Sequence, residues 1–160
     1  MRRMFSKPQL LEAVEQEAEV NGLKAFENIV DKDGHARFIE GDITIETISG
    51  LTQTYGKWAL SGSHLLIVVC YAIANGTNTG FISTLCSINI PQWIKNKIVA
   101  TGGSFVASHN ELAISSDDST QSFATYLRKS GDNLFISHAS LSVSADKNVR
   151  IAYDLLIDNE

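Results

Sequence analysis

The sequence YGKWALSGSHLLIVVCYAIAN, residues 55–75, decides the fold class. It contains a Ser-Gly-Ser turn at residues 61–63, which separates two strand-like segments. The second segment includes an unbroken apolar run of ten residues, Leu65 to Ala74. A membrane-spanning helix needs about 20 apolar residues, so this run is too short to cross a bilayer. A run that is apolar on both faces instead predicts a central β-strand, or a strand whose outer face is covered by a partner.

From Gly22 onward, the rest of the chain also alternates apolar and polar residues with a period of two. Residues 24–40 indicate a hairpin around the turn DKDG, and DITIETI at 42–48 places Ile43 and Ile45 on one face. About eight to ten short strands, with a turn roughly every 10 residues, predict an antiparallel β-sandwich or jelly roll. The remaining expected strands are residues 81–91, 110–116, 121–129, 133–144 and 148–158.

The last expected strand, residues 148–158, has the clearest alternation. Its apolar face contains Val149, Ile151, Tyr153, Leu155 and Ile157, and its polar face contains Arg150, Asp154 and Asp158. In residues 81–91 the expected inner face contains Ile82, Cys86, Ile88 and Ile90. Both patterns are typical of strands with one face against a core.

The two cysteines, Cys70 and Cys86, both lie in apolar strand-like segments. If residues 66–74 and 81–90 pair antiparallel across the polar loop 75–80, the two cysteines are near neighbours on adjacent strands. We nevertheless expect both to be buried, reduced thiols rather than a redox pair, because nothing at the N-terminus marks the chain for secretion.

The first 22 residues, MRRMFSKPQLLEAVEQEAEVNG, indicate a short α-helix. Ser6 is suited to cap the helix, and Pro8 lies in the first turn, where its missing N–H costs no hydrogen bond. The apolar stripe of this helix consists of Leu10, Leu11, Val14 and Ala18. A helix this short is marginally stable alone, so the stripe must pack against the chain's own sheet or against copies of itself. The chain therefore divides into an anchor or oligomerisation helix, residues 1–22, and a β-sandwich head domain, residues 23–160.

Composition and charge limit the classes of function. The length of 160 residues fits one domain with a single core. The formal net charge of −5 and the pI near 5.3 argue against a nucleic-acid partner, because phosphate neutralisation needs clustered Lys and Arg. The N-terminus has no apolar core region and no small-residue cleavage site, so no secretion signal is predicted.

No motif in the sequence predicts catalysis, a cofactor or a metal site. The four histidines are spread along the chain without ligand spacing: His35, His64, His109 and His138. Asp31 and Asp33 resemble the start of a calcium-binding loop, but Ala36 stands where such a loop needs glycine. We therefore expect no enzyme activity, no catalytic residues, no cofactor and no metal, and the ligand-binding residues are unknown.

Residues 91–98, PQWIKNKI, interrupt the β pattern with helical spacing. One face contains Ile90, Trp93, Ile94 and Ile98, and the other contains Gln92, Lys95 and Asn96. Two roles are open for Trp93. Its apolar neighbours favour a packed plug at the end of the sandwich, whereas an exposed indole would offer a platform for stacking on a sugar.

Three segments carry a family resemblance: MRRMFSKPQLLEAV, YGKWALSGSHLLIVV followed by a polar NGT turn, and IPQWIKNKI. Together they resemble small tail or baseplate-associated, receptor-binding-like proteins of phages and prophages of Gram-positive bacteria. The resemblance covers most of the chain, in the order helix, W-x-L-x-G-x-x-L strand pair and P-x-W-I-x-x-K-I. It implies a homotrimer with a β-sandwich or jelly-roll head and a helical N-terminal anchor. Several such proteins bind cell-wall saccharide, but this sequence lacks the long triple-helical neck of the receptor-binding members.

The resemblance implies a virion structural protein of the tail tip or baseplate, with or without contact to host cell-wall saccharide. The expected partners are copies of the chain itself and other tail or baseplate proteins, with no nucleic acid and no membrane. The protein would be located in the virion tail, after assembly in the cytoplasm of the bacterial host. Two alternatives stay open: a soluble prophage binding module outside the virion, and a carbohydrate hydrolase on a jelly-roll frame.

Overall fold

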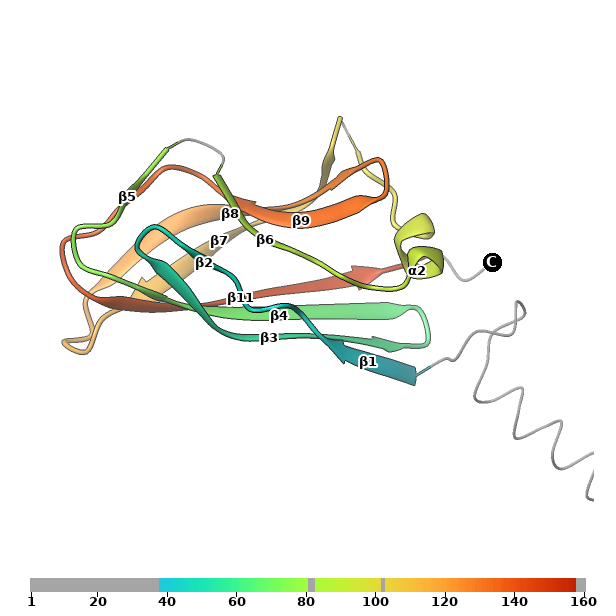
Figure 1. Ribbon diagram of the computed structural model, residues 1–160, viewed down its shortest axis with the longest axis horizontal. Helices are drawn as coiled ribbons and strands as arrows, with labels where there is room; N and C mark the ends of the chain where they lie inside the picture. The colour runs from blue at the N-terminus through green and yellow to red at the C-terminus, as the bar shows by residue number, and fades with distance from the viewer. Residues whose placement is uncertain (1–37, 81–82, 102, 158–160) are drawn as a thin grey trace, which may run out of the picture. The chain divides into compact units, whose positions relative to one another are not determined.

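The computed structural model describes residues 38–80, 83–101 and 103–157 (Figure 1). The expected N-terminal helix, residues 1–22, lies outside the described residues. The same is true of most of the hairpin expected at residues 24–40 and of six side chains named above: Asp31, Asp33, His35, Ala36, Ile82 and Asp158. These predictions stay predictions.

The described residues form β-strands connected by turns, with one short helix among them. The first strands are β1 (Phe38–Asp42), β2 (Thr47–Ile48), β3 (Leu51–Ser61), β4 (His64–Ile73), β5 (Asn78–Thr79) and β6 (Ser83–Ser87). The helix α2 (Gln92–Asn96) follows, and then β7 (Phe105–Ile114), β8 (Thr120–Ser130), β9 (Asn133–His138), β10 (Leu141–Ser142) and β11 (Lys147–Leu156). The prediction of a mostly-β chain is confirmed.

Within the described residues, most strands join one curled antiparallel sheet. Its order is β1-β3-β4-β11-β7-β8-β9-β6, with β2 also paired to β3, and β5 and β10 form a separate two-stranded sheet. In Figure 1, β6, β8 and β9 lie across from β3, β4 and β11, while α2 and β5 lie at opposite ends. The sheet thus curls into a half-barrel, and the hydrophobic core fills its inner side.

Strand β4 has the central position that its apolar run predicts. It pairs with β3 on one side and with β11 on the other, from His64 to Ile73. Gly62 in the β3–β4 turn adopts a left-handed φ of +60°, which glycine tolerates without strain. On the inner face of β4, five side chains are buried: Leu65, Ile67, Val69, Tyr71 and Ile73.

The outer face of β4 is apolar as well. Val68 is buried in the sheet surface, whereas Leu66 is 42% exposed. Two hydrophobic side chains on the neighbouring strands are also exposed, Tyr55 on β3 and Leu156 on β11. We call these four residues, Tyr55, Leu66, Val68 and Leu156, the outer apolar face.

Strand β11 has the predicted alternation. Val149, Ile151, Tyr153 and Ile157 are buried and Leu155 packs partly against the core, while Arg150 and Asp154 are exposed. In β6 and the residues after it, Cys86, Ile88 and Ile90 are buried as predicted. A register shift between Thr84 and Cys86 accompanies the burial of Leu85 as well.

The prediction that Ile43 and Ile45 lie on one face of a strand is wrong. Ile43 is buried, but Ile45 is 61% exposed. Residues 43–46 do not belong to a strand, so the two-residue period ends there. Ile43 instead donates its backbone N–H to the Gly56 carbonyl oxygen at 3.0 Å.

The predicted pairing of residues 66–74 with residues 81–90 is also wrong. The neighbours of β4 are β3 and β11, and β6 pairs with β9. After the loop 75–80 the chain therefore crosses to the opposite side of the half-barrel instead of folding back on β4. Both cysteines are free thiols, with Cys70 only partly buried and Cys86 buried in the core.

The helix α2 packs at one end of the core, through the buried side chains of Ile94 and Ile98. Trp93 is half-buried and packs against the core, as the plug interpretation predicts. The Lys129 ammonium donates to the carbonyl oxygens of Lys95 at 2.7 Å and Ile98 at 2.8 Å. The Lys95 carbonyl oxygen also accepts from the Ile98 backbone N–H at 3.1 Å, so the ammonium adds a charged bond at the C-terminal end of α2 and connects β8 to it.

Candidate functional site

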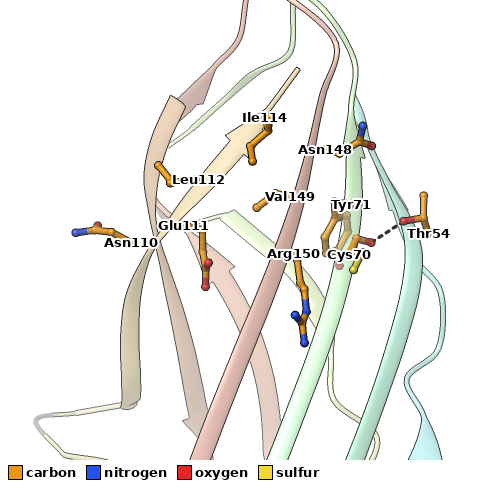
Figure 2. A pocket seen from close by; sticks show the side chains of 10 residues that line it. All are labelled: Thr54, Cys70, Tyr71, Asn110, Glu111, Leu112, Ile114, Asn148, Val149 and Arg150. Carbon is orange, nitrogen blue, oxygen red and sulfur yellow. Dashed lines mark hydrogen bonds between the residues drawn. The ribbon is translucent and has the colours of Figure 1, made fainter. Parts of the chain in front are cut away.

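A groove of about 550 Å³ opens beside the junction of β7 and β11 (Figure 2). Strands β3, β4, β7 and β11 supply its lining: Thr54, Cys70, Tyr71, Asn110, Glu111, Leu112, Ile114, Asn148, Val149 and Arg150. The lining combines a carboxylate, a guanidinium, amides and a hydroxyl with aliphatic side chains. Ligand sites typically have volumes of about 300 to 1,000 Å³ and a few polar groups among apolar walls, so the groove is the candidate site.

The groove exists because β7 and β11 separate from one another. In the described residues they share one residue pair, Asn148 with Ile114. Each strand is hydrogen-bonded on its other side, β7 to β8 and β11 to β4, so both stay ordered without each other. We call this junction the open seam and define it by Glu111, Ile114, Asn148 and Ala152.

Glu111 replaces part of the missing main-chain pairing at the open seam. Its carboxylate accepts a hydrogen bond from the Ala152 backbone N–H of the opposite strand. Burial raises the pKa of Glu111, and the charge of His109 and the bond from Ala152 counteract only part of that rise. The carboxylate is therefore partly desolvated, and it retains lone pairs for a ligand, since a carboxylate offers about four.

Arg150 stands beside Cys70 on the outer face of the sheet and is exposed. Figure 2 shows its guanidinium and the Glu111 carboxylate pointing toward the same end of the groove. The two groups form no ion pair, and within the described ranges the Arg150 side chain has no hydrogen-bond acceptor. The groove therefore contains a cation whose donors are available.

Lys147 fixes one end of the open seam. Its side chain is buried, and its ammonium donates to the carbonyl oxygen and the hydroxyl of Ser119, both at 3.2 Å. Ser119 belongs to the turn between β7 and β8, where Ser115 donates to the Asp117 carboxylate. Hydrogen bonds from Ser115 and Ser119 lower the pKa of Asp117 to about 2. Lys147 thus ties the first residue of β11 to the turn that ends β7.

A second junction, on the other side of the half-barrel, is closed by a polar network. The Tyr71 hydroxyl lies 3.2 Å from Gln53 Oε1 and 3.2 Å from the Leu85 carbonyl oxygen. Gln53 Oε1 also accepts from the Glu46 backbone N–H at 3.2 Å, and the Glu46 carboxylate accepts from the Ser87 backbone N–H at 3.2 Å. We call these five residues the closed seam, which connects β6 to β3 and β4.

Cys86 adjoins the closed seam, where its thiol is hydrogen-bonded with the Tyr71 hydroxyl. Burial raises the pKa of Cys86 to about 11. Burial also raises the pKa of Tyr71 above its ordinary value, so both groups stay neutral at physiological pH.

The structure keeps the described histidines apart. His64 lies 3.3 Å from Asp154 on the surface, and His109 packs edge-on against Tyr153 with ring centroids 4.8 Å apart. His138 is buried, which lowers its pKa. In the part of the chain that the structure describes, no group of three or more His, Cys, Asp or Glu side chains could hold a metal ion.

Sequence reasoning did not identify the groove. It placed Arg150 correctly on the polar face of its strand, but it assigned neither Arg150 nor Glu111 to a site. The sequence gives little indication that Arg150 belongs to a site, because it is one of several polar residues that alternate with apolar residues in 148–158. The site depends on β7 meeting β11, and a period of two does not specify which strands become neighbours.

No family model matches the chain, and neither the curated proteins nor the solved structures contain a significant match. Among the described residues, no helix has the length and apolar character needed to span a membrane.

Proposed function

We propose that this chain is a structural protein of the tail tip or baseplate of a phage or prophage of a Gram-positive bacterium. The outer apolar face is the observation that carries the proposal. Apolar side chains exposed together on a sheet are typical of surfaces that a partner covers. Three large apolar side chains are exposed on the same face of neighbouring strands: Leu66 on β4, Tyr55 on β3 and Leu156 on β11. A partner that covers this face would remove them from water.

The segments that resemble tail proteins support the same proposal. The W-x-L-x-G-x-x-L segment spans the β3–β4 hairpin, with Trp58, Leu60 and Leu65 buried. The P-x-W-I-x-x-K-I segment forms α2 at the end of the core. Both segments are structural elements of the domain, which is compatible with the role of a structural protein.

The finer architecture belongs to this proposal too. We infer a β-sandwich or jelly-roll head, because a single residue pair connects the β1-β3-β4-β11 part of the sheet to the β7-β8-β9-β6 part. The expected anchor, residues 1–22, lies outside the described residues, and the proposed head comprises the described strands. The assembly is a homotrimer that contacts other tail or baseplate proteins, in a virion assembled in the host cytoplasm.

Fractionation of disrupted virions tests the location. Mass spectrometry of tail and baseplate fractions from an induced prophage is expected to detect this chain in fixed proportion to known tail proteins. Detection only in the soluble lysate would support the alternative of a prophage binding module outside the virion. Light scattering of the purified chain tests the assembly state, and a monomer at micromolar concentration would refute the homotrimer.

A second candidate activity is contact with cell-wall saccharide, which the groove at the open seam favours. A carbohydrate hydrolase is less favoured. Glycoside hydrolysis usually requires two carboxyl groups roughly 5 to 10 Å apart across the scissile bond. Among the described residues that line the groove, Glu111 is the one carboxylate.

A further inference from the structure

Arg150 lacks a counter-charge within the described chain. The sequence has 18 acidic and 13 basic residues, yet no described carboxylate pairs with this guanidinium. Arg128, by contrast, is stacked between two phenylalanine rings at 5.1 and 5.2 Å and donates to Ser104. A guanidinium presents five N–H donors in a planar fork that matches the two oxygens of a carboxylate or phosphate. Arg150 is therefore available for an anionic group from outside the chain.

Whereas Arg150 requires a hydrogen-bond acceptor on a ligand, Glu111 requires a hydrogen-bond donor. In Figure 2 its carboxylate points toward the same end of the groove as the Arg150 guanidinium, and within the described residues it accepts one hydrogen bond, from the Ala152 backbone N–H. An ionised carboxylate accepts hydrogen bonds and donates none. A ligand that contacts both groups must therefore accept bonds from the guanidinium and donate bonds, through hydroxyl groups, to the carboxylate.

The walls of the groove define the rest of the ligand. Leu112 and Ile114 are 56% and 45% exposed, which is high for aliphatic residues, and they lie beside Val149 in the lining. The Asn110 and Asn148 amides add neutral donors and acceptors. Such walls suit a molecule with an apolar C–H face and polar edges, which is the character of a sugar ring.

We propose that the open seam binds an acidic saccharide, in which Arg150 holds a carboxylate or phosphate group and Glu111 accepts from a ring hydroxyl. The inference rests on the saccharide contact of the proposed function and specifies its site and its ligand class. It does not depend on the location of the protein in a tail.

Amide chemical shifts of the full-length, ¹⁵N-labelled chain test the proposal. The probes are glucuronate and glucose 6-phosphate, with glucose and inorganic phosphate as references for the sugar and the acid alone. Both acidic sugars are expected to shift the amides of residues 110–114 and 148–150. Each reference is expected to bind at least about tenfold more weakly, because it lacks either the charge-assisted bond or the hydroxyl contact.

Two variants with the same change in charge identify the residue responsible. Arg150→Gln is expected to weaken binding of both acidic sugars at least about tenfold. Lys57→Gln removes a positive charge from the same outer face of the sheet, outside the groove, and is expected to change affinity less than about twofold. The spectra of both variants also report whether each is folded.

Three outcomes would overturn the proposal. The first is that neither acidic sugar shifts these amides, and the second is that inorganic phosphate binds as tightly as glucose 6-phosphate. The third is an equal loss of affinity in Lys57→Gln and Arg150→Gln, which would indicate a general effect of net charge. None of these outcomes bears on the virion fractionation, so failure of the site and failure of the tail assignment are distinguishable.

Discussion

The open seam and the closed seam both connect strands that are distant in sequence, but they do so with different interactions. At the open seam, β7 and β11 share one main-chain pair, and Glu111 reaches across to Ala152. At the closed seam, the buried side chains of Tyr71 and Gln53 bridge the strands. A junction filled by buried side chains excludes solvent, whereas a junction with one pair leaves a groove of about 550 Å³. The closed seam therefore contributes buried hydrogen bonds to stability, and the open seam leaves space for a ligand, while Tyr71 takes part in both.

Each seam has one cysteine beside it, and we expect the largest difference between the seams in the rates at which these two thiols react. Cys70 lines the groove and is partly exposed, whereas Cys86 is buried beside Tyr71 with its pKa raised to about 11. At about pH 8, only roughly one Cys86 in a thousand would be a thiolate, the reactive form. A thiol reagent followed by mass spectrometry should therefore label Cys70 at least a hundredfold faster, and Cys70→Ala should abolish the fast phase. Similar rates would contradict the contrast between the seams.

Truncation of Tyr71 should have the largest effect on stability. Tyr71→Ala removes a buried aromatic side chain and should lower the free energy of unfolding by about 3 to 5 kcal/mol, measured by urea denaturation. Tyr71→Phe is the matched control for packing. It leaves the Leu85 carbonyl oxygen and Gln53 Oε1 without the hydroxyl, at a cost of about 1 to 3 kcal/mol. If Tyr71→Phe equals wild type, the closed seam depends on packing and not on its polar network.

Lys147→Met should have an intermediate effect on the free energy of unfolding, because Lys147 holds one end of the open seam. The buried ammonium donates twice to Ser119, and hydrogen bonds from charged groups contribute about 1.5 to 3 kcal/mol. We expect a loss of that size, with faster hydrogen exchange at the Ile114 and Asn148 amides. Lys57→Met, at an exposed lysine, should leave the free energy of unfolding almost unchanged. Equal effects of the two variants would show that Lys147 does not hold the seam.

Glu111→Gln should have the smallest effect, visible as a change in pH dependence. The pKa of Glu111 is raised above its ordinary 4.5 in the folded chain, so the unfolded chain loses this proton first as pH rises. The stability that protonated Glu111 contributes is fully present at pH values below its pKa in the unfolded chain. This stability is lost as pH rises through its pKa in the folded chain. Between about pH 4 and pH 7, wild type should therefore lose more stability than Glu111→Gln, which keeps a carbonyl oxygen for Ala152. A steeper decline in the variant would contradict this account.

Much of the fold could be predicted from sequence, because a strand with one buried face alternates apolar and polar residues. Ile151 and Tyr153 are buried as their alternation predicts, and the apolar run ending at Ala74 becomes the central strand. The errors have a common cause. Cys70 and Cys86 were expected side by side because consecutive strands usually pair, but here β4 pairs with β11, about 80 residues further along the chain.

The candidate site could not be predicted for the same reason. Glu111 and Arg150 are ordinary polar residues of two alternating strands, and nothing local distinguishes them. They line one groove because β7 and β11 meet at one residue pair and then diverge, which is a property of the whole curled sheet. The period of a strand gives the direction of a side chain, but the identity of its neighbours is set by contacts distant in sequence.

The hydrogen bonds around β6 also limit how copies of this chain can associate. β6 is the last strand in the sheet order, and a terminal strand can usually recruit a strand from another molecule through its free main-chain groups. The Leu85 carbonyl oxygen is engaged by Tyr71, and the Ser87 N–H by Glu46. A strand added at these positions would have to displace both bonds. Extension of the sheet by a strand from another molecule is therefore opposed at the β6 edge.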